Sequence, residues 1–372
     1  MKNKHCLLIL SFIIGLNIYH SGCETFAQDT IRPRNVILFI GDGMGLSHIY
    51  AAYTRNKGVL NIMKCPYTGF SMTHSASAYI TDSGAGGTAL SCGEKTYNGA
   101  IGMGTDTLPC KTILEYAEEK GMSTGLIATS AITHATPAAF IAHQRSRALY
   151  EDIAADFLKT DIDVFIGGGG KHFTRRSDSA DLTEQLKNKG YDVIMYPSSI
   201  PDLHSDKVAI FTAPDHNPRM SQGRGSMLPD ATEKAMSLLG KNDTGFFLMV
   251  EGSQIDWGGH NNDIDYIIEE LIDMDEAVGK ALAFAGKECN TLVIITADHE
   301  TGGLVVTNGN FSEGTVNVKF TSTGHTGVMV PVFAYGPGAE KFSGVYENTD
   351  IFNKLMNLLK IHQPCVSLTK SK

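Results

Sequence analysis

The sequence lacks several features that mark common classes of protein. It has no Lys- or Arg-rich run and its formal net charge is −9, which argues against a nucleic-acid-binding surface. It has no Cys-x-x-Cys pair, so neither a zinc knuckle nor a redox dithiol is indicated. No internal repeat or low-complexity linker interrupts the 372 residues, of which 42% are hydrophobic. This composition is that of an ordinary globular protein with a sizeable core.

A transmembrane-length apolar run is also missing. Residues Cys6–Ile18 are apolar, follow Lys2 and Lys4, and precede polar residues. Such a run is too short to span a bilayer comfortably and has the order of a signal peptide, with a plausible cleavage site after Ala27. We therefore predict a signal peptide over residues 1–27 and an exported protein, periplasmic or secreted. A lipid anchor at Cys23 is the alternative.

Cysteine pairing cannot be assigned from spacing. The cysteines that would remain after cleavage are Cys65, Cys92, Cys110, Cys289 and Cys365. Their number is odd, so an oxidising compartment would leave at least one thiol unpaired or bonded to another molecule.

Apolar runs typical of strands alternate with helical patterns along the chain. The expected strands are Asn35–Ile40, Thr124–Ala128, Asp163–Ile166, Tyr191–Met195, Phe246–Val250, Thr291–Thr296 and Val328–Tyr335. The expected helices include Lys111–Lys120, Ala180–Lys189 and Asn262–Ala285. This alternation predicts an α/β fold with a mostly parallel central sheet and helices on both faces. We expect one domain over residues 28–372, with a peripheral insertion at about 171–224, where Asp, Ser and Pro are frequent.

Acidic residues and histidines follow several of these strands. Asp42 lies between glycines after the first strand, and Asp298 and His299 follow Thr291–Thr296. The segment Val250–His260 carries Glu251, Asp256 and His260, and His325 precedes the last strand. Open α/β sheets bind ligands at the carboxyl ends of their strands. Asp with His suits zinc, and Glu with other oxygen donors suits magnesium.

Hydroxyl groups and one guanidinium complete these clusters. Ser83 stands at an expected helix start, where backbone N–H groups and the helix dipole favour an alkoxide or a bound phosphate. A plain helix cap is the simpler interpretation of Ser83 taken alone. His134 and Thr136 follow another strand, and Arg147 could bind two phosphate oxygens. Together the clusters predict a hydrolytic centre with several cations.

The order of these motifs resembles that of the alkaline phosphatases. The resemblance runs from Asn35 to about Gly338 and rests on Gly41–Gly45, Asp82–Ser83, His134–Ala139, Val250–His260, Thr296–His299 and Gly324–Thr326. It implies an alkaline-phosphatase-like fold and hydrolysis of phosphate monoesters to an alcohol and inorganic phosphate through a phosphoserine. It also implies a homodimer.

The resemblance further implies a role for each site residue. Asp256, His260 and His325 would bind one zinc ion, and Asp42, Asp298 and His299 a second one beside the nucleophile Ser83. Asp42 would reach a third cation, normally magnesium, shared with His134, Thr136 and Glu251. Arg147 would hold the phosphate oxygens, and Asp82 would hold Arg147.

Two positions depart from the best-known bacterial pattern. His134 stands where that pattern has Asp, and Trp257 stands where it has Lys. Imidazole makes the third site softer and less negative, so the identity of its metal is open. Losing the Lys removes a cation near bound phosphate, which predicts weaker retention of the product.

Related chemistries give the competing hypotheses. The Cys/Ser-x-Pro-x-Arg pentapeptide of sulfatases does not occur, because Ser83 is followed by Gly-Ala-Gly. A mutase or a phosphodiesterase would need further contacts to substrate, which spacing does not reveal. A non-catalytic exported protein that binds metal or phosphate is the alternative outside the enzymes. The physiological substrate is open.

Overall fold

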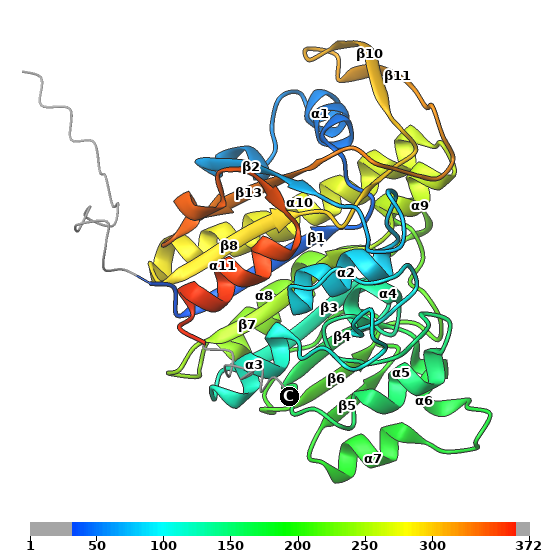
Figure 1. Cartoon of the computed structure of the whole chain (residues 1–372), viewed down its shortest axis with the longest axis vertical. Coiled ribbons are helices and arrows are strands. Elements are labelled where there is room, and N and C mark those ends of the chain that lie inside the picture. The colour runs from blue at the N-terminus through cyan, green and yellow to red at the C-terminus, as the bar shows by residue number, and fades with distance from the viewer. Residues whose placement is uncertain (1–31, 362–372) are drawn as a thin grey trace, which may run out of the picture. The chain divides into compact units, whose positions relative to one another are not determined.

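The computed structural model describes residues 32–361. The predicted signal peptide, Cys23 and Cys365 lie outside these residues. A ten-stranded sheet forms the centre, in the order β14-β2-β13-β8-β1-β7-β3-β4-β6-β5 (Figure 1). Within it β13 alone runs antiparallel to its neighbours β2 and β8. The predicted mostly parallel α/β sheet is therefore confirmed.

Seven of the ten strands of the sheet agree closely with the expected ranges, whereas β2, β6 and β14 were not predicted. In chain order they are β1 Asn35–Gly41, β2 Tyr67–Met72, β3 Ser123–Ala131, β4 Val164–Gly168, β5 Asp192–Met195, β6 Val208–Phe211, β7 Phe246–Gly252, β8 Thr291–Thr296, β13 Val330–Tyr335 and β14 Gly344–Glu347. Two small ladders pair β9 Glu300–Thr301 with β12 His325–Thr326, and β10 Val305–Asn310 with β11 Thr315–Lys319.

The sheet separates two apolar cores because successive side chains of a strand point to opposite faces. Along β1, Val36 and Leu38 enter one core while Ile37 and Phe39 enter the other. All four are fully buried. A strand that is buried on both faces has a continuous run of apolar residues, and this pattern allowed the central strands to be predicted from the sequence.

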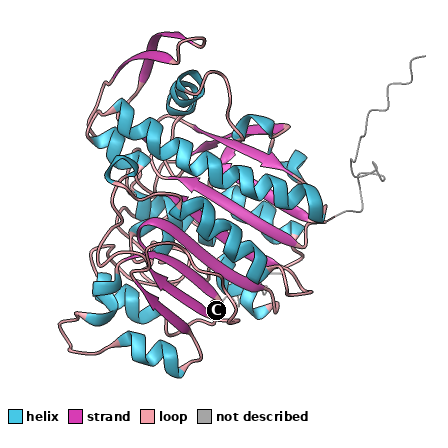
Figure 2. Ribbon diagram, turned by 180° about the vertical axis from the view of Figure 1, so that it is seen from behind, coloured by secondary structure: helices cyan, strands magenta, loops and turns pink. Residues whose placement is uncertain are grey.

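Helices cover both faces. One core contains side chains of α1 Leu46–Arg55, α8 Met227–Leu239 and the long α10 Ile264–Glu288. The other contains side chains of α2 Ser83–Cys92, α3 Ile113–Glu119, α5 Tyr150–Asp156, α6 Gly170–Thr174, α7 Leu182–Asn188 and α11 Thr349–Leu358. Short helices α4 Ala135–Ala138 and α9 Ile255–His260 follow β3 and β7. Figure 2 shows α10 crossing the back of the sheet.

The segment 171–224 lies at one edge of the sheet. It contributes α6, α7 and the last two strands, β6 and β5. β6 is buried, whereas β5 is partly exposed as the outermost strand. Whether this segment is an insertion stays a prediction. Within the part of the chain that the structure describes, no helix combines the length and apolarity needed to cross a bilayer.

A buried ion cluster ties the end of this segment to α10. The Arg224 guanidinium donates to Asp273 Oδ2 at 2.7 Å and also to the Glu270 carboxylate. All three side chains are 1% exposed. Removing the cation leaves two carboxylates without their partner in a low-dielectric interior.

We therefore expect Arg224→Leu to lower the free energy of unfolding by about 3–5 kcal/mol. Urea unfolding measures this change. The matched control is Lys280→Met, which removes the exposed ion pair of Lys280 with Glu233; its cost should stay under about 1 kcal/mol. Equal effects of the two substitutions would contradict the buried-pair argument.

Candidate active site

The strand register gathers the predicted ligands at one edge of the sheet. Ile40 on β1 pairs with Glu251 on β7 and with Thr296 on β8, and Ala128 on β3 also pairs with Glu251. Because these strands are parallel, their carboxyl ends meet at the same edge. Asp42 follows β1, and Asp298 follows β8.

Gly43 allows the turn after β1 to pass close to the other ligands. Its φ is +73°, and a Cβ atom there would lie 2.8 Å from the Asp256 Cα atom. Its N–H donates to Asp298 Oδ1 at 3.2 Å. A larger residue would be strained and would displace Asp256. The glycine after Asp42 is therefore a packing requirement of the site.

Ser83 is the first residue of α2 and is 1% exposed. Asp82 is the N-cap, and its Oδ1 accepts from the Ala85 N–H at 3.0 Å. The Ser83 Oγ lies 3.3 Å from His299 Nε2 and 3.5 Å from Asp42 Oδ1. The helix is therefore capped by Asp82, so the interpretation of Ser83 as a plain helix cap is wrong. Ser83 Oγ faces the ligand cluster.

Glycines in α2 let the helix approach this cluster. A Cβ on Gly86 would lie 3.0 Å from the Asp298 Cβ atom, and one on Gly84 would lie 2.8 Å from the Ala100 carbonyl oxygen. The Ser-Gly-Ala-Gly-Gly run after Asp82 therefore has a steric reason. It allows Ser83 to stand against the carboxylates.

Three groups of potential metal ligands lie at this edge. They are Asp256, His299 and His325; Asp42, Asp298 and His299; and Asp42, His134 and Glu251. Within each group the ligand atoms lie within 4.8 Å of one another. Groups that share Asp42 or His299 are adjacent, so the geometry suits neighbouring cations.

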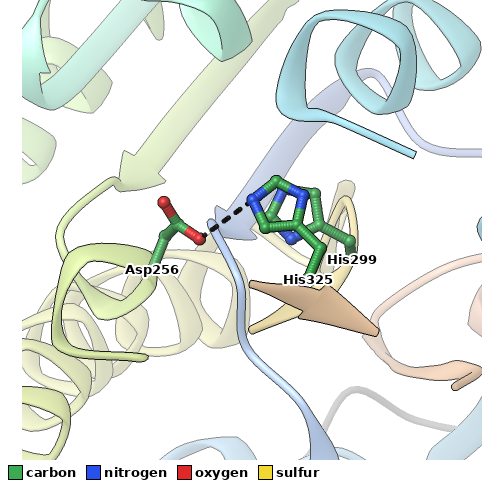
Figure 3. A group of neighbouring side chains, drawn as sticks. All are labelled: Asp256, His299 and His325. Atoms are coloured by element: carbon green, nitrogen blue, oxygen red, sulfur yellow. Dashed lines mark ion pairs between the residues drawn. The ribbon is translucent and has the colours of Figure 1, made fainter. Parts of the chain in front are cut away.

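His325 reaches the cluster from β12. The β12–β9 ladder pairs His325 with Thr301, two residues after His299. The rings of His299 and His325 stack with centroids 3.6 Å apart, and His325 Nε2 lies 3.5 Å from Asp256 Oδ1 (Figure 3). The small ladder thus joins two motifs far apart in the sequence.

His260 also lies at this position. Its spacing from Asp256 places both on one face of α9, with His260 Nε2 3.4 Å from Asp256 Oδ2. His260 Nε2 is 3.2 Å from His325 Nε2, and its side chain is 41% exposed. The predicted trio of Asp256, His260 and His325 is therefore together, with His260 on the solvent side.

The third group has buried polar atoms without partners. Glu251 Oε1 and His134 Nδ1 are buried and make no hydrogen bond. In the second group, Asp298 Oδ2 is likewise buried without a hydrogen-bond partner. The Thr136 hydroxyl lies 3.5 Å from Asp42 Oδ2. Unsatisfied buried oxygen and imidazole nitrogen atoms are costly unless a cation binds them. The donor sets thus fit metal ions.

Arg147 lies beside both Asp82 and His134. Its Nη1 donates to Asp82 Oδ2 at 2.9 Å, and its Nη2 is 3.3 Å from His134 Nε2. Burial would raise the pKa of Asp82, but hydrogen bonds from the Ala85 N–H and the Arg147 charge outweigh it and lower that pKa. Asp82 is thus an anion that orients Arg147.

The buried carboxylates repel one another. Burial raises the pKa of Asp42 well above its usual value, and the charges of Asp298, Asp256 and Glu251 raise it further. Burial also raises the pKa of Glu251 to about 8, although a hydrogen bond from Ser253 opposes the shift. Such crowding is expected where divalent cations supply the missing positive charge.

The sequence did not point to several residues that support the ligands. Thr301 donates its hydroxyl to Asp256 Oδ1 and lies 3.2 Å from His299 Nδ1. Ser253 donates to Glu251 Oε2 at 2.6 Å. Thr301 and Ser253 each lie two residues after a predicted ligand in the sequence, and only this proximity could have indicated their supporting role.

His216 is a further neighbour of the third group. Its ring meets the Trp257 ring edge-on at 4.9 Å, and both lie about perpendicular to the His134 ring, at 5.6 Å and 6.0 Å. His216 Nδ1 accepts from the Ala131 N–H. No pattern marked His216, which enters from the segment before α8.

Comparison with known proteins identifies the family. The model of the family described as alkaline phosphatase matches residues 33–316 and 307–361. The chain belongs to the alkaline phosphatase family. It is 37% identical to alkaline phosphatase 4 of Bacillus subtilis (strain 168), with 90% of each chain covered. It is 33% identical to the alkaline phosphatase of Escherichia coli (strain K12), with 86% of this chain and 84% of the relative covered.

A solved structure extends the agreement to the fold. The alkaline phosphatase from the Antarctic bacterium TAB5 is 43% identical and superimposes with a TM-score of 0.86, covering 90% of this chain and 99% of its own. The predicted alkaline-phosphatase-like fold and family are thereby confirmed. The chain is a metal-binding hydrolase of phosphate monoesters.

The raised pKa values predict how the metal-free protein responds to pH. A carboxyl group that binds its proton more tightly when folded stabilises the fold at low pH, and this contribution disappears as pH rises through the folded pKa. For Glu251 this stabilising contribution is complete below its ordinary pKa of 4.5 and is lost as the pH rises through its folded pKa of about 8. Burial lowers the pKa of His134 and His299, which opposes folding only below about pH 6.5.

After chelation, raising the pH from 6.5 to 9 should therefore destabilise the protein, with Glu251 contributing on the order of 2 kcal/mol. Urea unfolding at both pH values measures how much the free energy of unfolding falls between pH 6.5 and 9. Glu251→Gln is the matched variant and should make this fall smaller. A Glu251→Gln protein with the same slope as the parent would refute the assignment.

Proposed function

We propose that this phosphatase acts by two displacements at Ser83. The Ser83 Oγ attacks phosphorus, the Oγ–P bond forms, and the bond from phosphorus to the ester oxygen breaks. The ester oxygen leaves as the alcohol after taking a proton. Water then attacks the phosphoserine, the Oγ–P bond breaks, and Ser83 regains its proton as phosphate departs. The observation that carries this proposal is Ser83 Oγ at a helix start, facing Asp42 and His299.

Cation binding is proposed with the predicted ligands. Asp256, His260 and His325 would hold one zinc ion, and Asp42, Asp298 and His299 a second. His134, Thr136 and Glu251 would hold a third cation together with Asp42, normally magnesium. When bound, such ions supply Lewis-acid stabilisation of the attacking and leaving oxygens. A histidine-to-glutamate variant of the TAB5 enzyme carries Mg in its M3 site; that variant has a carboxylate in place of an imidazole, whereas this chain keeps the softer ligand His134.

Arg147 and Asp82 position the phosphoryl group. A guanidinium offers two parallel N–H donors that match two phosphate oxygens. Asp82 holds Nη1 at 2.9 Å and is itself fixed by N–H groups of Ala85 and Gly99. Phosphoryl transfer needs mainly positioning and charge stabilisation, which these side chains provide.

The setting of the enzyme is proposed from the sequence. The basic and apolar start of the chain supports export to the periplasm or secretion, and a homodimer is proposed from the resemblance to the alkaline phosphatases. The catalytic domain would comprise residues 28–372, with the insertion at about 171–224. Varied small phosphate monoesters would be its substrates.

Replacing Ser83 tests the mechanism. Ser83→Ala should lower monoester hydrolysis by roughly a thousandfold or more, because the covalent route is lost. Trapping of ³²P on the parent protein, absent in Ser83→Ala, gives a second measurement. Full hydrolysis by Ser83→Ala would refute the nucleophile, and faster cleavage of diesters than of monoesters by the parent would refute the substrate class.

Chelation should abolish activity, and zinc with a second cation should restore it.

Replacing Trp257 tests whether this residue weakens the binding of the product phosphate. A lysine at this position would place a cation near bound phosphate, so Trp257→Lys should lower the inhibition constant for inorganic phosphate by roughly tenfold, or about 1.4 kcal/mol. Trp257→Gln is the matched neutral control and should not lower it. An unchanged or higher constant in Trp257→Lys would count against the idea.

A further inference from the structure

The β10–β11 hairpin separates His299 from His325 in the sequence. Figure 1 shows this hairpin at one end of the molecule, extending away from the central sheet. It joins the body of the protein through Gly302–Leu304 before β10 and Thr321–Thr326 after β11, and we call these two segments the hairpin base. His325 lies in the hairpin base, and His299 lies three residues before it. The contacts that hold the hairpin base therefore also position these two potential ligands.

Apolar burial does little to fix the second segment of the hairpin base. Within this chain, none of the side chains from Thr321 to Met329 is buried. The β12–β9 ladder contains only two residue pairs, and so short a ladder is marginal without further support. Backbone hydrogen bonds add to it, from the Gly302 N–H to the Gly324 carbonyl oxygen at 3.0 Å and from the Thr321 N–H to the Gly302 carbonyl oxygen at 3.1 Å. The position of His325 thus depends on polar contacts.

Glu300 joins the two segments of the hairpin base through one carboxylate. Its Oε1 accepts from the Leu304 N–H at 3.1 Å. Its Oε2 accepts from the Gly303 N–H at 3.3 Å and also from the Thr326 hydroxyl. Hydrogen bonds to an ionised acceptor are stronger than those between neutral groups. Since Glu300 is only 4% exposed, these bonds lie where water competes little for them.

The surroundings of Glu300 leave its carboxylate free to bind the hairpin base. A Cβ atom on Gly45 would lie 2.4 Å from Glu300 Cγ, so the glycine makes room for this side chain. His48 is fully buried, and its Nδ1 accepts from the Gly45 N–H at 3.1 Å. The His48 Nε2 lies 3.9 Å from Glu300 Oε1, which is too far for a hydrogen bond. Burial lowers the pKa of His48 although the charge of Glu300 opposes this shift, so the ring is neutral at neutral pH and forms no ion pair.

His325 is held at two points. Its Nδ1 makes a 2.8 Å hydrogen bond with the Thr81 carbonyl oxygen, which fixes the ring so that Nε2 faces Asp256 Oδ1 at 3.5 Å. Its backbone is held through the next residue, Thr326, whose hydroxyl donates to Glu300. Removing supporting contacts of this kind typically lowers metal affinity by about 10–100-fold. Glu300 itself belongs to none of the three groups of potential ligands.

We propose that Glu300 is a positioning residue whose carboxylate clamps the hairpin base and thereby holds His325 in place for cation binding. This inference rests on the proposed zinc ion at Asp256, His260 and His325. Glu300 acts on that ion only through His325. The position of His299 depends less on this clamp, because its side chain is fully buried. Loss of Glu300 should therefore weaken one cation group selectively.

Zinc retention tests the proposal without turnover. The zinc-loaded enzyme is titrated with a chromogenic chelator, and His325→Ala identifies the zinc ion of this group, because that variant should lose it. Glu300→Ala should weaken the binding of the same zinc ion by about 10–100-fold and leave the other zinc ion unchanged. Glu300→Gln should recover most of this affinity, because its amide oxygen can accept from the same N–H groups and its amide nitrogen can donate to the Thr326 hydroxyl. Excess zinc should restore monoester hydrolysis in Glu300→Ala.

Thr326→Val is the second variant if Glu300→Ala does not fold. It removes the hydroxyl that donates to Glu300 and should weaken the binding of the same zinc ion. The matched control is Thr307→Val, which removes a hydroxyl that donates to the Asn317 carbonyl oxygen at 3.1 Å within the hairpin. This control should leave the binding of both zinc ions unchanged.

Three results would overturn the proposal. Unchanged zinc retention in both Glu300→Ala and Thr326→Val would show that the clamp does not hold His325. Equal weakening of both zinc ions would show a general loss of structure. A Glu300→Gln protein that binds zinc as weakly as Glu300→Ala would show that charge, and not hydrogen bonding, matters. By contrast, zinc binding that His325→Ala leaves unaffected would refute the proposed zinc group itself.

Discussion

The mutual repulsion of buried carboxylates is the constraint on which the site depends. Asp42, Glu251 and Asp298 are fully buried at the carboxyl ends of neighbouring parallel strands. Burial raises the pKa of all three, and the charges of neighbouring carboxylates raise the pKa of Asp42 and Glu251 further. Cations bound among these groups would offset their repulsion, most of all at alkaline pH, where the carboxylates are charged.

The surrounding structure holds that arrangement in place. Gly43 permits the close turn after β1, and glycines in α2 let Ser83 approach the carboxylates. Thr301 and Ser253 hydrogen-bond to the ligands, which restricts their rotamers and orients their free atoms. The rings of Trp257 and His216 pack edge-on against the His134 ring, so aromatic groups surround this ligand.

Much of the fold was predictable from local pattern. The ranges Asn35–Ile40 and Thr291–Thr296 appeared as apolar runs because both faces of these strands are covered. The helix expected at Asn262–Ala285 is observed as α10, with its N-cap at Asp263. Within 171–224 the sequence predicted β5 as Tyr191–Met195 but not β6 Val208–Phe211, a buried strand of four residues that pairs with β4 and β5. Four apolar residues are too few for their periodicity to distinguish a buried strand from other buried segments.

The ligand types and their order along the chain were determined by the sequence, since Asp, His and Ser carry their chemistry wherever they stand. The i, i+4 spacing of Asp256 and His260 even placed them on one helical face. Which ligands share a cation depends on strand register, because a single parallel sheet brings Asp42, Glu251 and Asp298 to one edge. The contacts of His216 with Trp257 and of Tyr79 with Gly327 join residues distant in sequence. No local periodicity encodes such contacts, so only tertiary packing decided them.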